Sequence, residues 1–267
     1  MGATELPRLD YNAVEGMICR FIRRYANGRG VVLGLSGGVD SATVAALAVR
    51  ALGKEKVLAL IMPEKSTTPS SDTDDALSLA GIFGIRHELI DITNSVKSVM
   101  ESIKRPGDRV AEGNIKARLR MTILYYFANL EGRIVLGSGD RSELLIGYFT
   151  KYGDGGADLL PIGGLYKSQV RGLARHLGIP ERIADKASSP RLWPEQMAEK
   201  ELGINFDEID FLLHLIVDRR LSFDSALKEA GEQRRADIEK AFRRMEENSH
   251  KLRTPPVAKI LTRAVLK

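Results

Sequence analysis

One segment, residues 31–41 with the sequence VVLGLSGGVDS, restricts the fold of this chain more than any other. An apolar run of strand type leads into a Ser-Gly-Gly turn, and a helix is expected to begin at Ser41. Glycines let the backbone N–H groups of such a turn approach an anion closely, and the following helix points its positive end at the same place. The segment therefore predicts a strand, an anion-binding loop and a helix in direct succession.

An acidic residue inside this loop narrows its chemistry. Asp40 would repel a bound phosphate, whereas a divalent cation between the two groups would remove the conflict. The Gly-Lys-Ser/Thr ending of the Walker loop is missing. A turn that uses its glycines only for tightness is the alternative interpretation, but it gives Asp40 and both serines no role. The pattern Ser-Gly-Gly-x-Asp-Ser resembles the loop of enzymes that split ATP into AMP and pyrophosphate.

Composition and charge exclude several classes of protein. The 267 residues, 43% of them apolar, suit one large α/β domain, or one domain with a small appendage. The chain has neither an apolar run of about eighteen residues nor a secretory pattern at its N-terminus, so no membrane partner is expected. The single cysteine, Cys19, suits a reducing cytoplasm and is expected to be a small buried side chain. The net charge is +5, but basic and acidic residues alternate, which favours phosphate-bearing small molecules over nucleic acid.

The hydrophobic pattern alternates between strand-type runs and helical spacing. This alternation predicts an α/β fold with a doubly wound, Rossmann-like parallel sheet, flanking helices and a helical C-terminal region. We expect a single domain over residues 1–267, with a nucleotide-binding core at about 28–180 and a mainly helical part at about 200–267. Strands are expected at 31–35, 57–62, 87–91 and 134–136, and helices at 10–25, 41–53, 70–83, 93–103, 114–129, 167–177, 206–217, 222–230 and 234–251.

The position of the ligand site follows from this topology. In doubly wound sheets, ligands bind beyond the carboxyl ends of the strands, where the strand order reverses. The loops that follow Leu35 and Leu136 both lie at such ends. They are therefore expected to border one common site.

Longer motifs in the second half of the chain resemble the NAD synthetase family of ammonia-dependent type. They comprise residues 113–121, 142–158, 161–170 and 192–194, and the likeness extends from the N-terminal helix to Lys251. The resemblance implies that ATP and Mg²⁺ are used to adenylate the nicotinate carboxylate of deamido-NAD, with release of pyrophosphate. Ammonia then attacks the acyl adenylate and gives NAD and AMP. The resemblance also implies a homodimer with the dinucleotide site at the subunit interface.

The same resemblance assigns the ATP site and the metal site. Asp40 and Glu143 match the family's Mg²⁺ ligands, although Glu143 alone is also typical of an acid at a helix start. Lys167 is expected to balance the phosphates as a mobile charge, the alternative being a solvated residue in the first turn of a helix. Ser138 stands where many members carry threonine, and residues 139–141 read Gly-Asp-Arg where many have Ser-Asn-Lys. The expected ATP contacts are Gly34, Leu35, Ser36, Gly37, Gly38, Val39, Asp40, Ser41, Ser138, Lys167 and Ser189.

A second set of residues is assigned to deamido-NAD. Arg118 lies one helical turn after Asn114, so both side chains can face one groove. The glycine-rich loop after Lys151 is expected to become ordered around the substrate and to exclude water. In this loop, Asp154 is the candidate that accepts a proton from ammonium or ammonia, with an ordinary Asp-Gly turn as the alternative. The expected contacts to deamido-NAD are Arg118, Lys151, Asp158, His250 and Lys251.

Two features leave alternatives open. Residues 188–193 read Ser-Ser-Pro-Arg-Leu-Trp, where many members have Pro-Ser-Ala-Gly-Leu-Trp, so Pro190 and Arg191 replace small residues beside Ser189. The chain has no room for an amidase domain, which implies free ammonia or ammonia from a separate glutaminase. Competing interpretations are a loop relative that adenylates a tRNA base or another acid, and a non-catalytic nucleotide-binding dimer.

Overall fold

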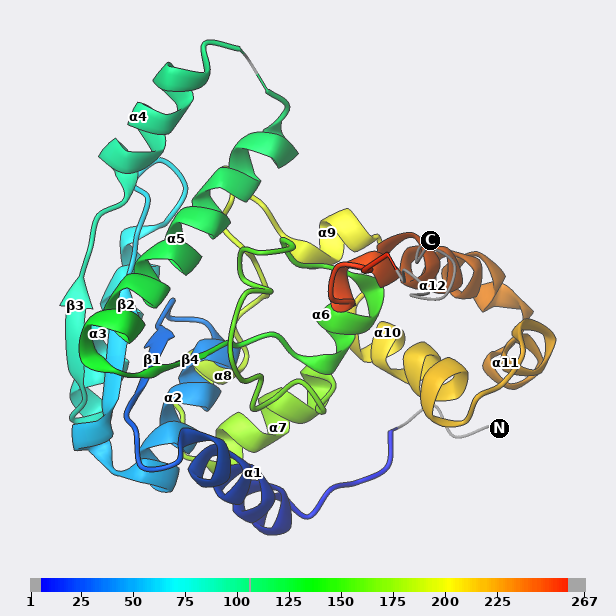
Figure 1. Ribbon diagram of the computed structural model, residues 1–267. Coiled ribbons are helices and arrows are strands. Elements are labelled where there is room, and N and C mark those ends of the chain that lie inside the picture. The colour runs from blue at the N-terminus through cyan, green and yellow to red at the C-terminus, as the bar shows by residue number, and fades with distance from the viewer. Residues whose placement is uncertain (1–5, 106, 259–267) are drawn as a thin grey trace, which may run out of the picture.

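The computed structural model describes residues 6–105 and 107–258. Both ends of the predicted domain, residues 1–5 and 259–267, lie outside the described residues. The described part contains a parallel sheet with helices on both faces and a group of helices to one side (Figure 1). The strands are β1 (Val31–Gly34), β2 (Val57–Ile61), β3 (Arg86–Leu89) and β4 (Ile134–Leu136).

The strand order is β3-β2-β1-β4, and every pair is parallel. The chain moves from β1 outward to β2 and β3, and then returns to place β4 on the other side of β1. The switch point therefore lies between β1 and β4, where Leu33 pairs with Leu136. This arrangement confirms the predicted doubly wound sheet and brings the loops after β1 and β4 to the same edge.

Alternate residues of the strands enter two separate cores. Val31 and Leu33 pack into one apolar cluster, whereas Val32 packs into another on the opposite face. The first cluster is covered by α1 (Tyr11–Ala26), α2 (Val39–Leu52), α3 (Ser70–Phe83) and α7 (Lys167–His176). The second is covered by α4 (Thr93–Ile103) and α5 (Arg109–Glu131). Strands that are covered on both faces read as unbroken apolar runs, which explains residues 57–62.

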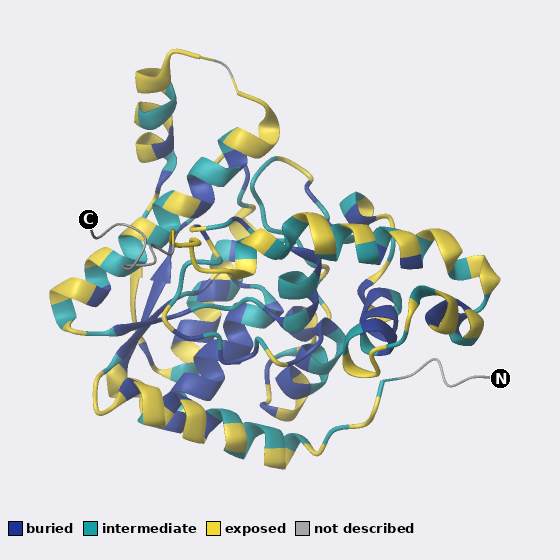
Figure 2. Ribbon diagram, turned by 45° about the vertical axis from the view of Figure 1, so that its right-hand side comes forward, coloured by how far each residue is buried: buried dark blue, intermediate teal, exposed yellow. Residues whose placement is uncertain are grey.

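Edge strand β3 differs from the others, since all four of its residues are exposed (Figure 2). Some bounds also differ from prediction for local reasons. Helix α5 begins at Arg109 instead of 114, because the side chain of Asp108 accepts a hydrogen bond from the Ala111 N–H and caps the helix. Cys19 is 4% exposed, as predicted for a small apolar side chain.

The C-terminal helices form clusters of their own beside the sheet. A buried group that includes Phe206 and Leu213 also takes in Ile146 and Tyr166, and so joins these helices to the region around the sheet edge. Among residues 6–105 and 107–258, every helix is too short or too polar to span a bilayer. The remaining elements are α6 (Arg141–Ile146), α8 (Glu181–Ala184), α9 (Ala198–Leu202), α10 (Phe206–Leu213), α11 (Phe223–Ala230) and α12 (Arg235–Asn248), with a π-helical turn at His214–Asp218 and 3₁₀ turns at Lys54–Lys56, Glu232–Arg234 and Ser249–Leu252.

A buried ion pair fixes the connection between β2 and α3. The carboxylate of Glu64, which is 3% exposed, accepts hydrogen bonds from the hydroxyls of Ser66 and Thr67 and from Lys116 Nζ at 2.8 Å. Burial opposes ionisation, but these donors outweigh it and lower the pKa of Glu64 to about 2. Because Lys116 belongs to α5, the pair ties this helix to the edge of the sheet where the loops meet.

This depressed pKa predicts a specific acid sensitivity. Unfolded Glu64 takes up a proton near its ordinary value of 4.5, whereas the folded carboxylate resists until about 2. Ionised Glu64 therefore adds to the free energy of unfolding above pH 4.5, by at most about 3 kcal/mol. This contribution is lost as the pH falls towards 2. Chemical denaturation at several pH values gives the free energy of unfolding of the wild-type protein and of the Glu64→Gln/Lys116→Met double variant. Between pH 4.5 and 2, this free energy should fall less steeply in the double variant than in the wild-type protein. Equal slopes for both proteins would contradict this assignment.

Candidate active site

A large cavity opens at the carboxyl ends of β1, β2 and β4. Its volume is about 910 Å³, near the upper end of the range usual for small-molecule sites. Its walls come from the loop after β1, from α5, from the loops around α6, and from residues 186–193 and 248–251. Segments that are far apart in the sequence thus meet at the predicted switch point.

The loop after β1 has a closed shape that its small residues make possible. The hydroxyls of Ser36 and Ser41 lie 3.0 Å apart, and Ser41 Oγ also accepts the Ser36 N–H at 3.2 Å. Gly37 has a φ of 78°, and a Cβ atom there would lie 2.2 Å from the carbonyl oxygen of Asp72. Helix α2 begins directly after the loop, so its unpaired N–H groups face the cavity mouth.

The close approach at Gly37 predicts different outcomes for two glycine substitutions. Gly53, at the other end of α2, has a similar φ of 83° but nothing within 4 Å of a built Cβ. Gly53→Ala should therefore cost only the backbone strain, about 1–3 kcal/mol of unfolding free energy. Gly37→Ala should add a clash with backbone and weaken ATP binding, because the loop must move. Calorimetric ATP binding by both variants checks this, and equal affinities would contradict the loop assignment.

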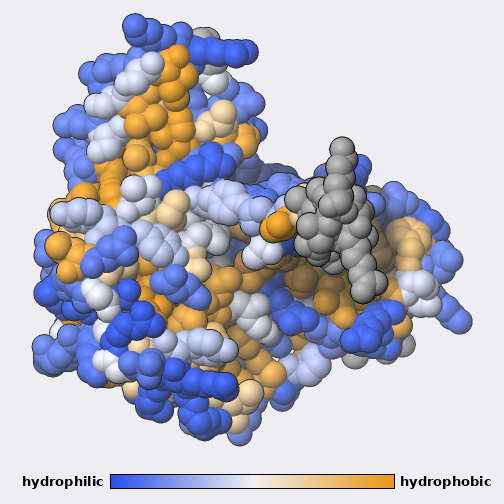
Figure 3. All heavy atoms as spheres, viewed as in Figure 1, coloured by the Kyte–Doolittle hydropathy of each residue, from blue (hydrophilic) through white to orange (hydrophobic). Residues whose placement is uncertain are grey.

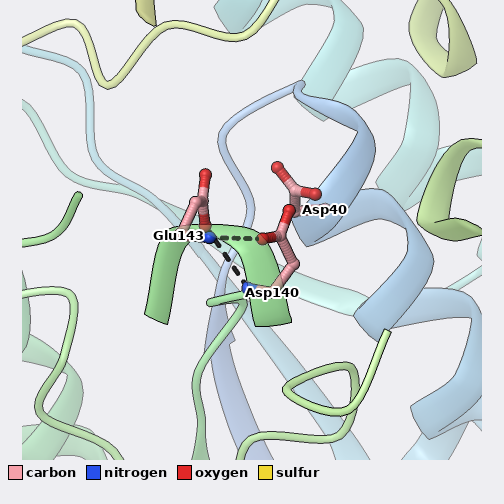
Figure 4. A group of neighbouring side chains, drawn as sticks. All are labelled: Asp40, Asp140 and Glu143. Atoms are coloured by element: carbon pink, nitrogen blue, oxygen red, sulfur yellow. Dashed lines mark hydrogen bonds between the residues drawn. The ribbon is translucent and has the colours of Figure 1, made fainter. Parts of the chain in front are cut away.

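Four charged side chains gather beneath this loop. Asp40 comes from the first turn of α2, Asp140 and Glu143 from the start of α6, and Lys167 from the start of α7 (Figure 4 shows the three acids). Lys167 Nζ lies 2.7 Å from Asp40, 2.8 Å from Asp140 and 3.0 Å from Glu143. Asp140 and Glu143 hold each other through a capping box, in which each side chain accepts the other's backbone N–H.

Burial sets the electrostatics of this four-residue cluster. The side chains of Lys167 and Asp140 are fully buried, and those of Asp40 and Glu143 are about one-fifth exposed, at 21% and 20%. Burial, together with repulsion by Asp40, raises the pKa of Asp140 to about 6 although Lys167 opposes the shift. Burial also raises the pKa of Glu143 well above its usual range. Burial alone would lower the pKa of Lys167, but the three carboxylates together raise it.

The donor set of the cluster fits a hard divalent cation. Carboxylate oxygens of Asp40, Asp140 and Glu143 all lie within 4.8 Å of one another. Oδ1 of Asp40 is buried and has no hydrogen-bond partner among the described residues. Oxygen ligands are those that Mg²⁺ takes, usually with one or two carboxylates, phosphates and water. The ammonium of Lys167 holds these acids together in the structure described.

A second layer of polar contacts positions the cluster from behind. Asp210 of α10 is fully buried, and its carboxylate accepts hydrogen bonds from the hydroxyl of Ser142 and from the N–H and hydroxyl of Ser168. The Ser142 hydroxyl in turn accepts the N–H of Lys167 at 3.0 Å. The C-terminal helices therefore fix the starts of both α6 and α7.

Another part of the cavity wall carries basic side chains and a turn. Lys151 Nζ donates to the carbonyl of His250 at 2.9 Å, and Lys251 Nζ donates to the carbonyl of Gly147 at 2.6 Å. The carboxylate of Asp154 accepts the N–H of Thr150 at 2.8 Å, so it closes a turn at the cavity surface. Carbonyl oxygens hold these lysines, and their charges remain available to an anionic ligand.

Most of the predicted site residues line the cavity, and three do not. Gly37 lies against Asp72, and Lys167 lies below the surface, so the prediction of a mobile lysine is wrong. Asp158 turns away, because its carboxylate accepts the Val135 N–H at 2.9 Å and the Tyr125 hydroxyl at 3.0 Å. The lining residues among the predicted set are Gly34, Leu35, Ser36, Gly38, Val39, Asp40, Ser41, Arg118, Ser138, Glu143, Lys151, Asp154, Ser189, His250 and Lys251.

The unusual segment 188–193 crosses the cavity beside α3. Its Ser189 hydroxyl donates to the carbonyl of Gln196, and Arg191 Nε donates to Asp72 at 2.8 Å. Arg191 has a φ of 52°, a conformation rare for a side chain of this size. Sequence reasoning missed Asp140, although the Asp-x-x-Glu spacing of residues 140–143 is the signature of a capping box.

Comparison of the chain with known proteins identifies its family. The family model described as NAD synthase matches residues 12–255. The chain belongs to the NAD synthase family. It is 53% identical over 258 residues to the NH(3)-dependent NAD(+) synthetase of Hyperthermus butylicus, covering 94% of this chain and 92% of that relative. The corresponding synthetase of Archaeoglobus fulgidus is 49% identical over 259 residues, covering 94% of this chain and 98% of that relative.

Solved structures of NAD synthase family members share the fold. The NH3-dependent NAD synthetase of Campylobacter jejuni, solved with a nitrate ion, matches with a TM-score of 0.79 and 32% identity, over 94% of this chain and all of that chain. The NMN synthetase of Francisella tularensis matches with a TM-score of 0.81 and 33% identity, over 95% of this chain and all of that chain. The predicted Rossmann-like fold and family are therefore confirmed.

Proposed function

We propose that this chain is a ligase that amidates deamido-NAD (nicotinic acid adenine dinucleotide) with ammonia and ATP, giving NAD, AMP and pyrophosphate. The observation that carries this proposal is the meeting of Asp40 and Glu143 beneath a glycine loop at the switch point of the sheet. Around them lies a cavity whose lining includes the cationic side chains of Arg118, Lys151 and Lys251. Membership in the NAD synthase family supports the same reaction.

The first half of the reaction needs a leaving group on a poorly electrophilic carboxylate. The substrate carboxylate attacks the α-phosphate of ATP, and the bond to pyrophosphate breaks. Backbone N–H groups between Ser36 and Ser41, at the start of α2, hold the departing pyrophosphate. Asp40 and Glu143 would hold Mg²⁺, which neutralises negative charge on the phosphates when it is bound. Lys167 keeps the carboxylates in place from below.

The second half needs ammonia, a proton acceptor and the exclusion of water. Asp154 lies on the cavity surface, in the turn that packs against α5, and is the group assigned to accept the proton. The N–H of Thr150 fixes its orientation. Arg118, Lys151, His250 and Lys251 are assigned to the negatively charged dinucleotide. Asp158 is assigned no direct contact with the dinucleotide, because its carboxylate accepts the Val135 N–H and does not line the cavity.

Assembly and nitrogen supply complete the proposal. A homodimer is supported by an apolar stripe on the arm formed by α4 and α5 (Figure 3). On α5, Val110, Tyr126 and Leu130 are each more than half exposed. A separate glutaminase that supplies ammonia, and a cytoplasmic location suited to one free cysteine, stay predictions.

Product analysis tests the proposed reaction. The purified chain is incubated with ATP, Mg²⁺ and deamido-NAD, with either ammonium or glutamine as nitrogen source, and NAD, AMP and pyrophosphate are quantified. NAD formation with ammonium, in equal amount to AMP, is expected. A parallel arm with nicotinate mononucleotide is needed because one similar solved structure is that of an NMN synthetase. Preference for the mononucleotide, or ATP cleavage without amide formation, would overturn the substrate assignment.

The role of Asp154 is open to a separate test. Asp154→Asn should slow amide formation about 10²–10⁴-fold, because a proton acceptor is removed while the turn to Thr150 is kept. The rate of acyl-adenylate formation should change much less. Pyrophosphate release in single-turnover experiments measures that rate. Unchanged turnover across the pH range would leave Asp154 as a turn residue only.

A further inference from the structure

Arg120 of α5 is a cavity-lining cation to which neither the family resemblance nor the proposed function gives a task. Its Nε donates to the carbonyl of Met62 at 3.0 Å, at the carboxyl end of β2. The two terminal NH₂ groups of its guanidinium have no hydrogen-bond partner among residues 6–105 and 107–258. Because Arg120 lines the cavity, these donors are available to a ligand.

The nearest acids do not satisfy this guanidinium. Burial lowers the pKa of Arg120, and the carboxylates of Glu64 and Asp154 oppose that shift from nearby. Glu64 is occupied by its bonds to Ser66, Thr67 and Lys116. The carboxylate of Asp154 accepts the N–H of Thr150. A half-buried guanidinium whose terminal donors face a cavity can bind an oxyanion, and its planar fork matches a carboxylate.

The surroundings of Arg120 indicate which part of a ligand it meets. Met62, whose carbonyl accepts the Arg120 Nε–H, also lies close to Gly34. A Cβ on Gly34 would be 3.6 Å from the Met62 side chain. Gly34 begins the segment 34–41 to which ATP is assigned, called the ATP loop below. The turn with Asp154 presses on α5 on either side of Arg120, with Gly153 against Ala117 and Gly156 against Met121. Arg120 therefore lies between the ATP loop and the candidate proton acceptor.

We propose that Arg120 binds the carboxylate of the acid substrate and directs it between the ATP loop and Asp154. This inference rests on the proposed function. The carboxylate is the group that must meet ATP first and ammonia second, and Arg120 lies between the residues assigned to those two steps. A fixed fork holds one carboxylate oxygen while the other attacks the α-phosphate.

The same donors serve the amidation step. The ammonia lone pair forms a bond to the acyl carbon, and the C=O electron pair moves onto the oxygen held by Arg120. When that pair returns, the C–O bond to AMP breaks, AMP leaves with the bonding electrons, and nitrogen loses a proton to Asp154. Because Met62 fixes the guanidinium in place, its donors stabilise the intermediate oxyanion without reorganising.

A comparison of the affinities for deamido-NAD and NAD isolates the contact between Arg120 and the carboxylate. The two dinucleotides differ only at this group, which is a carboxylate in deamido-NAD and a carboxamide in NAD. Arg120→Gln should weaken deamido-NAD binding about 10- to 100-fold, as expected for loss of a hydrogen bond to a charged group. Binding of NAD should weaken by less than about 10-fold, as for a neutral partner. Calorimetric titration of both dinucleotides without ATP measures the two affinities. Arg20→Gln removes the same group from the exposed face of α1 and is the matched control.

Three outcomes decide the matter in a wild-type preparation that makes NAD. Selective loss of deamido-NAD affinity in Arg120→Gln, with ATP affinity unchanged, supports the proposal. Equal effects on both dinucleotides, or weakened binding of ATP alone, overturn it. If Arg120→Gln does not fold, Arg120→Lys replaces it in the titrations. Arg120→Lys keeps the positive charge but not the planar guanidinium, and should retain part of the preference for deamido-NAD over NAD. A wild-type protein that makes no NAD refutes the proposed function instead, so the two failures are distinguishable.

Discussion

Replacing Asp40 by Asn is expected to slow pyrophosphate release about a hundred- to a thousandfold at fixed Mg²⁺, the scale of losing one electrostatic contact to the transition state. The substitution keeps the size of the side chain and removes one of the acids that face the ATP loop. Oδ2 of Asp40 pairs with Lys167, but Oδ1 has no partner among the described residues and is available to a bound cation. The Mg²⁺ concentration for half-maximal rate should rise as well.

A control separates this effect from a general change in charge. Asp74→Asn alters an exposed residue of α3 and should leave the rate and the Mg²⁺ dependence unchanged. Pyrophosphate release from ATP and deamido-NAD, measured across a Mg²⁺ titration, gives both quantities. An Asp40→Asn protein with wild-type rate and Mg²⁺ dependence would refute the metal assignment.

Replacing Lys167 by Met is expected to lower the free energy of unfolding by roughly 3–5 kcal/mol, the scale of breaking a buried ion pair. The ammonium is fully buried and lies within 3.0 Å of all three carboxylates, so its removal leaves like charges together in a dry place. Nζ of Lys167 lies over the ring of Phe206, 5.2 Å from its centroid, and a Met side chain of similar length can still reach that ring. The decrease in the free energy of unfolding therefore comes mainly from the removed charge and less from a change in side-chain volume.

The loss in Lys167→Met should depend on pH and on Mg²⁺. Lowering the pH protonates Asp140 and Glu143, whose pKa values are already raised, so the folded variant should regain stability towards pH 5 while the wild-type protein gains less. Millimolar Mg²⁺ should restore stability through the same carboxylates. Denaturation in urea with and without Mg²⁺ measures both effects. A variant as stable as wild type at neutral pH would contradict the electrostatic account.

Much of the fold was predictable because its elements have clear sequence signals. The buried strands are short apolar runs, and the helices between them show regular apolar spacing, so the parallel sheet follows from the alternation. Helix α6 was missed because it has only six residues and follows a strand within a polar stretch. The exposed strand β3 was predicted at nearly the correct residues, although its pattern carries little burial signal.

The candidate site was predictable where function resides in a loop, and not where it depends on packing. Asp40 and Glu143 could be paired because both follow neighbouring strands of the switch point. The burial of Lys167 was not predictable, because it arises when α10 covers the start of α7 through Asp210 and Phe206. The carboxylate of Asp158 accepts the backbone N–H of Val135 in β4 and the hydroxyl of Tyr125 in α5, and no local sequence pattern predicts these contacts.

Isotope transfer tests the central claim that the substrate carboxylate cuts ATP at this site. Deamido-NAD with a heavy oxygen isotope in its carboxylate is converted with ammonium, ATP and Mg²⁺, and the products are analysed by mass spectrometry. The account predicts one labelled oxygen in the phosphate of AMP and none in pyrophosphate. Label in a phosphate released from the outer end of ATP, or AMP without label, would contradict it.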